Sequence, residues 1–196
     1  MIEITEFGHI NIVVSDIDEA TDFYHTLFGF ELVQCFKDFR NSGFAKSAGF
    51  FDYPDDVLVD INFLKIPQEK IYIELISYKQ PESGRAVKEF SPNDLGGPRH
   101  IALRVKNIDA AFEKIKTLAG MTLISSRDDY RPYRLDKVHP SDFSFSDEKL
   151  ESDKSMKIKA AEISSSISFF YFTDKFGVTW ELEEEPTGID DPALSI

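Results

Sequence analysis

Two stretches of the chain decide its fold: GHINIVVSDIDEA at residues 8–20 and RHIALRVKNIDAA at residues 99–111. They align without a gap at a constant offset of 91 residues, which places His9 over His100. The alignment continues through five positions at which the second copy has the same residue type: Ala20, Thr26, Leu27, Gly29 and Leu32. Identity at one fixed register indicates an internal duplication.

Both copies predict the same succession of elements. In the first copy, residues 9–14 are short and rich in Ile and Val, as a strand requires. The Ser-Asp pair at 15–16 then offers an N-cap, apolar residues recur at helical spacing over 17–28, and Gly29 is a stop signal. A strand over 30–36 and a hairpin of strands 57–66 and 70–78 follow. Residues 5–80 are therefore predicted to form one β-α-β-β-β module.

The second copy predicts the same module with a longer connection. A strand over 100–105, Asn107 as N-cap, a helix over 108–118 and Gly120 repeat the opening elements. We predict a linker at 81–97, a second module at 98–185, an insert within it at about 125–166, and an acidic tail at 186–196. The insert is rich in Ser and charge and has little periodicity, which predicts a lid or a partly disordered loop. The fold class is α+β, with two paired βαβββ modules.

The composition excludes several functions and locations. A formal net charge of −13 repels phosphate backbones, so no nucleic-acid partner is expected. The single cysteine, Cys35, allows no disulfide within the chain and has no neighbouring base in the sequence. Neither a signal peptide nor an apolar run of membrane-spanning length is present, so we expect a cytoplasmic protein without a membrane partner.

Each module contributes one histidine from its first strand and one glutamate from its last. Glu74 in IEL corresponds to Glu181 in WEL. Because strand side chains alternate between faces, two sheets curled around one cavity would direct four side chains into it: His9, Glu74, His100 and Glu181. Two buried carboxylates need neutralisation, which a divalent cation supplies. Two imidazoles and two carboxylates suit Ni, Zn, Co, Mn or Fe and leave coordination positions for a substrate.

Several other polar side chains can be interpreted either as structural or as functional. Four are candidates for binding an oxygen-rich small molecule: Asn11, Asn62, Tyr72 and Arg104. A rim ion pair for Arg104 and a turn hydrogen bond for Asn11 are equal alternatives. A lone histidine at a strand start is usually structural, and only the paired symmetry raises His9 above that. His25 and His139 have no repeat partner and are interpreted as structural, and Trp180 is expected to pack under a helix, away from Glu181.

Four segments carry a resemblance to a known family: GHINIVVSDIDEATDFYHTLFGFEL, IYIEL, GGPRHIALRVKNIDAAFEKI and DKFGVTWELE. They resemble the vicinal oxygen chelate superfamily, also called the glyoxalase/bleomycin-resistance/dioxygenase superfamily. In the last segment, Lys175 and Phe176 replace the family's usual Pro and Asp. The resemblance implies paired modules in a cupped, mostly antiparallel sheet around a metal. It also implies that the ligands are His9, Glu74, His100 and Glu181.

The resemblance implies a range of reactions. A second glutamate at Glu74 favours a metal-dependent lyase, isomerase or epimerase that stabilises an enediolate-type intermediate, with Glu74 or Glu181 doubling as general base. Val13 stands where glyoxalase I has an arginine, which argues against glutathione as a substrate component. The alternatives are an extradiol-type dioxygenase and a non-catalytic ligand-binding or resistance protein. The site can be completed within one chain or by exchange with a second copy, which allows a homodimer.

Overall fold

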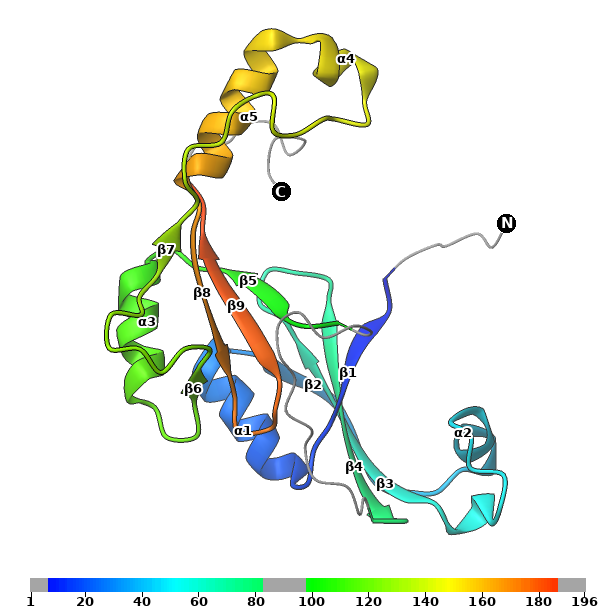
Figure 1. Ribbon diagram of the computed structural model, residues 1–196. Helices are drawn as coiled ribbons and strands as arrows, with labels where there is room; N and C mark the ends of the chain where they lie inside the picture. Colours follow the sequence, from blue (N-terminus) through cyan, green and yellow to red (C-terminus); the bar gives the residue numbers. More distant parts are fainter. Residues whose placement is uncertain (1–6, 83–97, 187–196) are drawn as a thin grey trace. The chain divides into compact units, whose positions relative to one another are not determined.

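The computed structural model describes residues 7–82 and 98–186. The chain divides into two units, Met1–Ala86 and Val87–Ile196 (Figure 1). Apart from residues 81, 82 and 186, the predicted linker and acidic tail lie outside the described residues. Among the helices described, none is both long enough and apolar enough to cross a membrane.

Unit 1 is a four-stranded sheet with a long helix against one face. Its elements in chain order are β1 (His9–Val13), α1 (Ile17–Phe28), β2 (Glu31–Phe39), β3 (Leu58–Lys65) and β4 (Tyr72–Gln80). The strand order is β1-β4-β3-β2. Strand β1 runs parallel to β4, and the other neighbours are antiparallel. The parallel pair places the first and last strands of the module side by side.

The bounds of α1 follow from its end residues. The Asp16 side chain accepts a hydrogen bond from the backbone N–H of Glu19 at 2.9 Å, which caps the helix start. Gly29 ends the helix in the left-handed region at φ 73°, where glycine has no steric penalty. The apolar side of α1 packs on β3 and β4. The buried side chains at this interface include Ala20, Tyr24, Leu64, Ile73 and Leu75.

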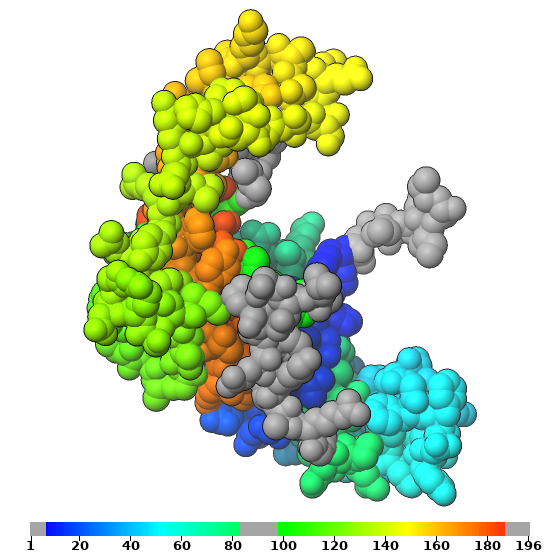
Figure 2. Space-filling view, in the orientation of Figure 1, coloured from blue at the N-terminus to red at the C-terminus, as the bar shows by residue number. Residues whose placement is uncertain are grey.

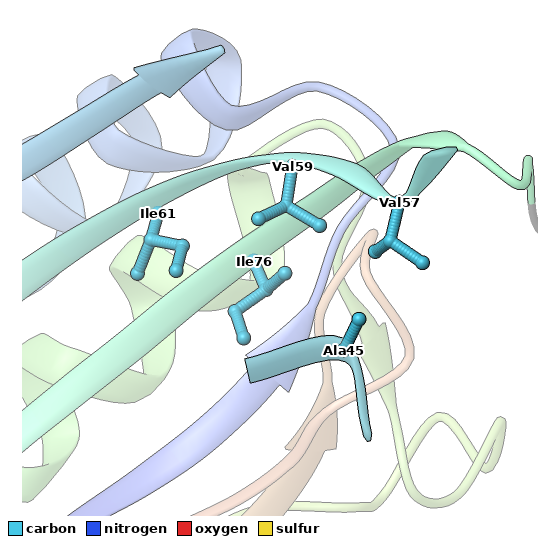
Figure 3. Packing of buried hydrophobic residues seen from close by; sticks show 5 residues of the cluster. All are labelled: Ala45, Val57, Val59, Ile61 and Ile76. Atoms are coloured by element: carbon cyan, nitrogen blue, oxygen red, sulfur yellow. The ribbon is translucent and has the colours of Figure 1, made fainter. Parts of the chain in front are cut away.

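The connection between β2 and β3 contains the short helix α2 (Ser42–Ser47) and the 3₁₀ turn η1 (Pro54–Asp56). Ala45 of α2 belongs to a buried apolar cluster with Val57, Val59, Ile61 and Ile76 (Figure 3). By strand register, Ile61 pairs with Ile76 on the sheet face opposite to Leu75. The connection therefore packs back on the face that α1 leaves open.

Unit 2 repeats the topology. Its elements are β5 (Ile101–Arg104), α3 (Ile108–Thr117), β6 (Thr122–Leu123), β7 (Tyr133–Arg134), α4 (Glu148–Ser152), α5 (Lys154–Ser166), β8 (Ser168–Thr173) and β9 (Thr179–Glu184). The sheet order is β5-β9-β8-β6, with β7 also paired to β8. Strand β5 runs parallel to β9. The predicted α+β fold of two βαβββ modules is confirmed.

Helix α3 covers one face of the second sheet. Asn107 caps it by accepting a hydrogen bond from the N–H of Ala110 at 2.9 Å, as predicted. Phe112 meets Phe170 edge-to-face, with ring centroids 5.1 Å apart. The helix ends at Thr117, one residue before the end predicted from the sequence, because Leu118 is already extended.

The insert is more regular than its sequence indicated. It contains β7 and the helices α4 and α5, where an irregular loop was expected. Ala160 and Ile163 of α5 are buried against three partly buried side chains of the same insert: Phe143, Phe145 and Met156. Figure 2 shows these helices (yellow) as a lobe of unit 2. The insert thus has a small apolar cluster of its own, built from residues distant in its sequence.

Candidate metal centre

The first candidate half-site lies on β1 and β4. Because these strands pair in parallel, with Asn11 opposite Glu74, His9 and Glu74 lie on the same sheet face. His9 Nε2 is 3.1 Å from Glu74 Oε2. The glutamate side chain is 13% exposed and the histidine 43%, so the carboxylate is held at the sheet while the imidazole reaches outward.

The second half-site repeats this geometry on β5 and β9. Ala102 stands opposite Glu181 in the parallel pair, and His100 precedes it on the same face. His100 Nε2 is 3.0 Å from Glu181 Oε2, and the two side chains are 42% and 13% exposed. Two sequences that differ at most positions thus produce one arrangement of a ring nitrogen and a carboxylate oxygen.

The separation of nitrogen and oxygen fits a shared cation as well as a direct hydrogen bond. Two ligands about 2.1 Å from one metal, at right angles to each other, are about 3.0 Å apart, whereas a tetrahedral angle separates them by about 3.4 Å. The observed 3.1 Å and 3.0 Å agree with adjacent ligands of a five- or six-coordinate ion. Each described unit brings such a pair together, and the described residues contain no cluster of three or more His, Cys, Asp or Glu side chains.

The two glutamates are held by different hydrogen-bond donors. Asn11 Nδ2 donates to Glu74 Oε2 at 3.1 Å and to the Glu74 carbonyl oxygen at 3.2 Å. The repeat counterpart of Asn11 is Ala102, which has no polar side-chain atom. Asn11, predicted to bind substrate, is therefore placed by the structure against a candidate ligand.

Unit 2 supplies its donor from the neighbouring strand instead. Tyr171 on β8 stands opposite Glu181 and makes a side-chain hydrogen bond to it. Burial, together with the Glu181 carboxylate, raises the pKa of the Tyr171 hydroxyl, so this oxygen keeps its proton and donates. The equivalent position in unit 1, opposite Glu74, is Phe63. Sequence analysis did not select Tyr171; the signal available was the hairpin register that sets it across from Glu181.

The turn before β9 fixes the approach to Glu181. Asp174 Oδ1 accepts hydrogen bonds from the N–H groups of Phe176 and Val178 at 2.9 Å and 3.0 Å. Its other oxygen accepts from Trp180 Nε1 at 2.8 Å, and Gly177 adopts φ 81°. Trp180 is fully buried on the face opposite to Glu181, as expected from the sequence.

The remaining predicted substrate residues separate into two groups. Tyr72 stands beside His9 in the strand register and shares the face of Glu74. Arg104 forms ion pairs with Glu183 at 2.9 Å and Glu185 at 2.8 Å, the rim ion pair that the sequence allowed.

Asn62 does not lie with them. Its Nδ2 donates to Thr21 Oγ1 of α1 at 2.8 Å, and its register partner Leu75 lies on the helix-covered face. Since Glu74 lies on the opposite face, we remove Asn62 from the candidate site. His25, interpreted as structural, donates from Nδ1 to the Phe30 carbonyl oxygen at 2.9 Å just beyond the end of α1.

Comparison with known proteins identifies the family. The model of the Glyoxalase/Bleomycin resistance protein/Dioxygenase superfamily matches residues 8–134, more than half of the chain. The chain therefore belongs to this superfamily. The matched region contains His9, Glu74 and His100 and ends before Glu181.

Solved structures with the same fold are distant in sequence. A glyoxalase family protein from Bacillus cereus is 17% identical, with a TM-score of 0.63, 93% of this chain covered and 95% of the other. The fosfomycin resistance protein FosX from Listeria monocytogenes is 17% identical, with a TM-score of 0.51, covering 94% and 97%. A glyoxylase/bleomycin resistance protein/dioxygenase domain from Frankia sp. EAN1pec is 12% identical, with a TM-score of 0.52, covering 94% and 100%. No curated protein sequence matches the chain.

Proposed function

We propose that this protein is a divalent-metal-dependent enzyme of the lyase, isomerase or epimerase type, acting on a small oxygenated molecule. The ligands of one cation are His9 and Glu74 from one module with His100 and Glu181 from the other, paired within a chain or between two copies. The supporting observation is the repeated half-site, in which nitrogen and oxygen lie 3.1 Å and 3.0 Å apart. Ni, Zn, Co, Mn and Fe are the ions that this donor set suits.

The chemistry follows from the donor set and its surroundings. A divalent cation held by these histidines and glutamates would supply Lewis acidity, which stabilises negative charge that develops on substrate oxygens. Glu74 or Glu181 is the base proposed to accept the proton next to the substrate carbonyl. Asn11 and Tyr171 hold the two carboxylates by neutral hydrogen bonds. Tyr72 and Arg104 are the proposed orienting residues, on the faces that carry the glutamates.

The second glutamate favours this reaction class over oxygen chemistry. Non-haem Fe(II) oxygenases commonly use two histidines and one carboxylate, which leaves more positions open for oxygen and substrate. Here Glu74 occupies its half-site with the same geometry and the same 13% exposure as Glu181. A set of two complete half-sites also argues against a metal-free binding protein.

Metal analysis tests the ligand assignment. Full-length protein purified without chelator is expected to contain about one divalent ion for each set of four ligands. The variants Glu74→Ala and Glu181→Ala are expected to contain no bound divalent ion. Glu113→Gln is the matched control, since Glu113 is an exposed carboxylate on α3. Stoichiometric metal in Glu181→Ala would contradict the assignment.

A substrate screen tests the reaction class. We expect turnover among 2-oxo thioesters and hemithioacetals, with activity and metal lost together in Glu181→Ala. Oxygen uptake with catechols, followed by an oxygen electrode, would replace the proposal with a dioxygenase.

A further inference from the structure

Aromatic side chains of unit 1 gather on the sheet face that carries Glu74. Phe63 stands directly opposite Glu74 in the β3–β4 register. Its ring lies edge-on to the His9 imidazole, with centroids 5.8 Å apart, and 6.5 Å from the ring of Phe36 on β2. A line of rings therefore begins at the candidate half-site itself.

The line continues away from His9 toward α2. Phe36 and Phe39 have ring centroids 5.3 Å apart, and Phe39 and Phe44 are 6.0 Å apart. We call Phe63, Phe36, Phe39 and Phe44 the aromatic row. All four are partly buried and pack on the apolar cluster drawn in Figure 3. Each of the four residues is therefore only partly covered by the cluster.

The chemistry of the row limits what it can bind. Phenylalanine rings offer apolar surface and no hydrogen-bonding group, and ligand sites combine such walls with a few placed polar groups. Here the polar groups are His9, Glu74 and Asn11, at one end of the row. The chain's net charge of −13 repels polyphosphorylated or other polyanionic carriers.

We propose that the aromatic row binds an aryl or long alkyl tail of the substrate, whose vicinal oxygens lie at the half-site. The inference rests on the proposed function. It narrows the substrate class to molecules that carry an apolar, uncharged tail next to their two oxygens. Phe63 adjoins the oxygen-bearing end, and Phe36, Phe39 and Phe44 hold the part of the tail farther from His9.

Chelating probes with different tails test the proposal. Acetohydroxamate and 3-phenylpropionohydroxamate present the same two adjacent oxygens and differ only in their apolar tail. In calorimetric titrations of Mn(II)-loaded full-length protein, the phenyl probe is expected to bind at least about tenfold more tightly. Phe36→Ala and the milder Phe36→Leu are expected to remove most of this difference while leaving acetohydroxamate affinity unchanged.

A matched variant in unit 2 locates the effect. Phe169 is also a partly buried ring, and it is paired with Glu183 on the face of Glu181. Phe169→Ala is expected to keep the advantage of the phenyl probe. Loss of that advantage in Phe169→Ala but not in the Phe36 variants would overturn the proposal, as would equal affinity of the two probes for the unmodified protein. If neither probe binds and no metal is retained, the proposed function itself fails.

Discussion

The two half-sites share a geometry and differ in what supports it. In unit 1, the donor to Glu74 is Asn11, from the parallel strand on one side. In unit 2, the donor to Glu181 is Tyr171, from the antiparallel strand on the other side. Each donor is replaced by an apolar residue in the opposite copy. What the repeat has kept is one neutral hydrogen bond to each carboxylate, and either neighbouring strand can provide it.

The connections between the second and third strands differ in a similar way. In unit 1, α2 folds back and completes an apolar cluster on the sheet. In unit 2, the longer insert builds a separate cluster around Ala160 and Ile163. Both units therefore have extra structure in the same connection. In unit 1 it packs on the sheet, and in unit 2 it packs mainly on itself. The first and last strands, which carry the histidines and glutamates, are instead alike in the two units.

The largest expected effect concerns the residue beneath each glutamate. Trp180 and its repeat counterpart Ile73 are both fully buried, but only Trp180 donates a hydrogen bond, to Asp174. Trp180→Ala is expected to lower the free energy of unfolding by about 3–5 kcal/mol. Trp180→Phe removes the hydrogen bond together with one buried ring and costs at least about 1–3 kcal/mol, whereas Ile73→Val costs about 0.5–1.5 kcal/mol. Urea unfolding followed by circular dichroism measures all three variants.

One outcome would contradict the predicted difference between Trp180 and Ile73. If Trp180→Phe is no more destabilising than Ile73→Val, the hydrogen bond to Asp174 does not stabilise the turn before β9. The two units would then differ in the size of this buried residue alone.

A second prediction exchanges the donors. On the proposed metal site, Asn11→Ala and Tyr171→Phe are each expected to weaken Mn(II) binding about 10-fold to 100-fold, because the carboxylate loses its orienting partner. Asn11→Ala combined with Phe63→Tyr gives unit 1 the arrangement of unit 2 and is expected to recover affinity. Calorimetry on metal-stripped protein measures each variant. Unchanged affinity in both single variants would show that the donors do not support ligation.

The smallest effect concerns a charged cluster found in unit 1. Lys79 Nζ lies 2.7 Å from both Asp38 Oδ1 and Asp60 Oδ2. The hydrogen bond with Lys79 lowers the pKa of Asp38, and the same bond raises the pKa of Lys79. Because Asp38 and Lys79 are exposed, solvent and salt weaken the interaction between them, whereas Asp60 is buried.

The sign of the pH dependence follows from the two shifts. The Asp38 contribution to stability is present above its unfolded pKa of about 3.9 and is lost as pH falls through the lowered folded value. The Lys79 contribution is present below about 10.4 and is lost as pH rises through the raised folded value. Lys79→Met is therefore expected to lower the urea midpoint slightly at pH 7 and by less at pH 3. An equal difference at both values would contradict this origin.

Sequence alone predicted the features that depend on local pattern and on the repeat. The caps at Asp16 and Asn107 are set by neighbouring residues, and the constant offset aligned His9 with His100. The pairing of each histidine with its glutamate within a unit was not predicted and follows from the parallel first and last strands of the structure. The joining of both pairs on one cation stays a prediction.

Features that depend on the register between strands could not be predicted from the sequence. Tyr171 gains its role only from the antiparallel hairpin that sets it opposite Glu181. Asn62 was placed among the substrate residues because its polarity was visible and its face was not. Helix α5 was missed because its buried residues pack on Phe143 and Phe145, which lie well before it in the chain.

The attachment of the insert has a consequence for engineering. The N–H of Leu135 donates to the Ile167 carbonyl oxygen at 3.4 Å, and Tyr133 pairs with Phe169, so the chain leaves and rejoins the sheet at one place. A gene in which a two-residue Asn-Gly turn replaces the codons between these positions would therefore join strand ends that are already neighbours. The same junction offers a site for a fluorescent reporter or an affinity tag, because the βαβββ module already accommodates a long insertion there.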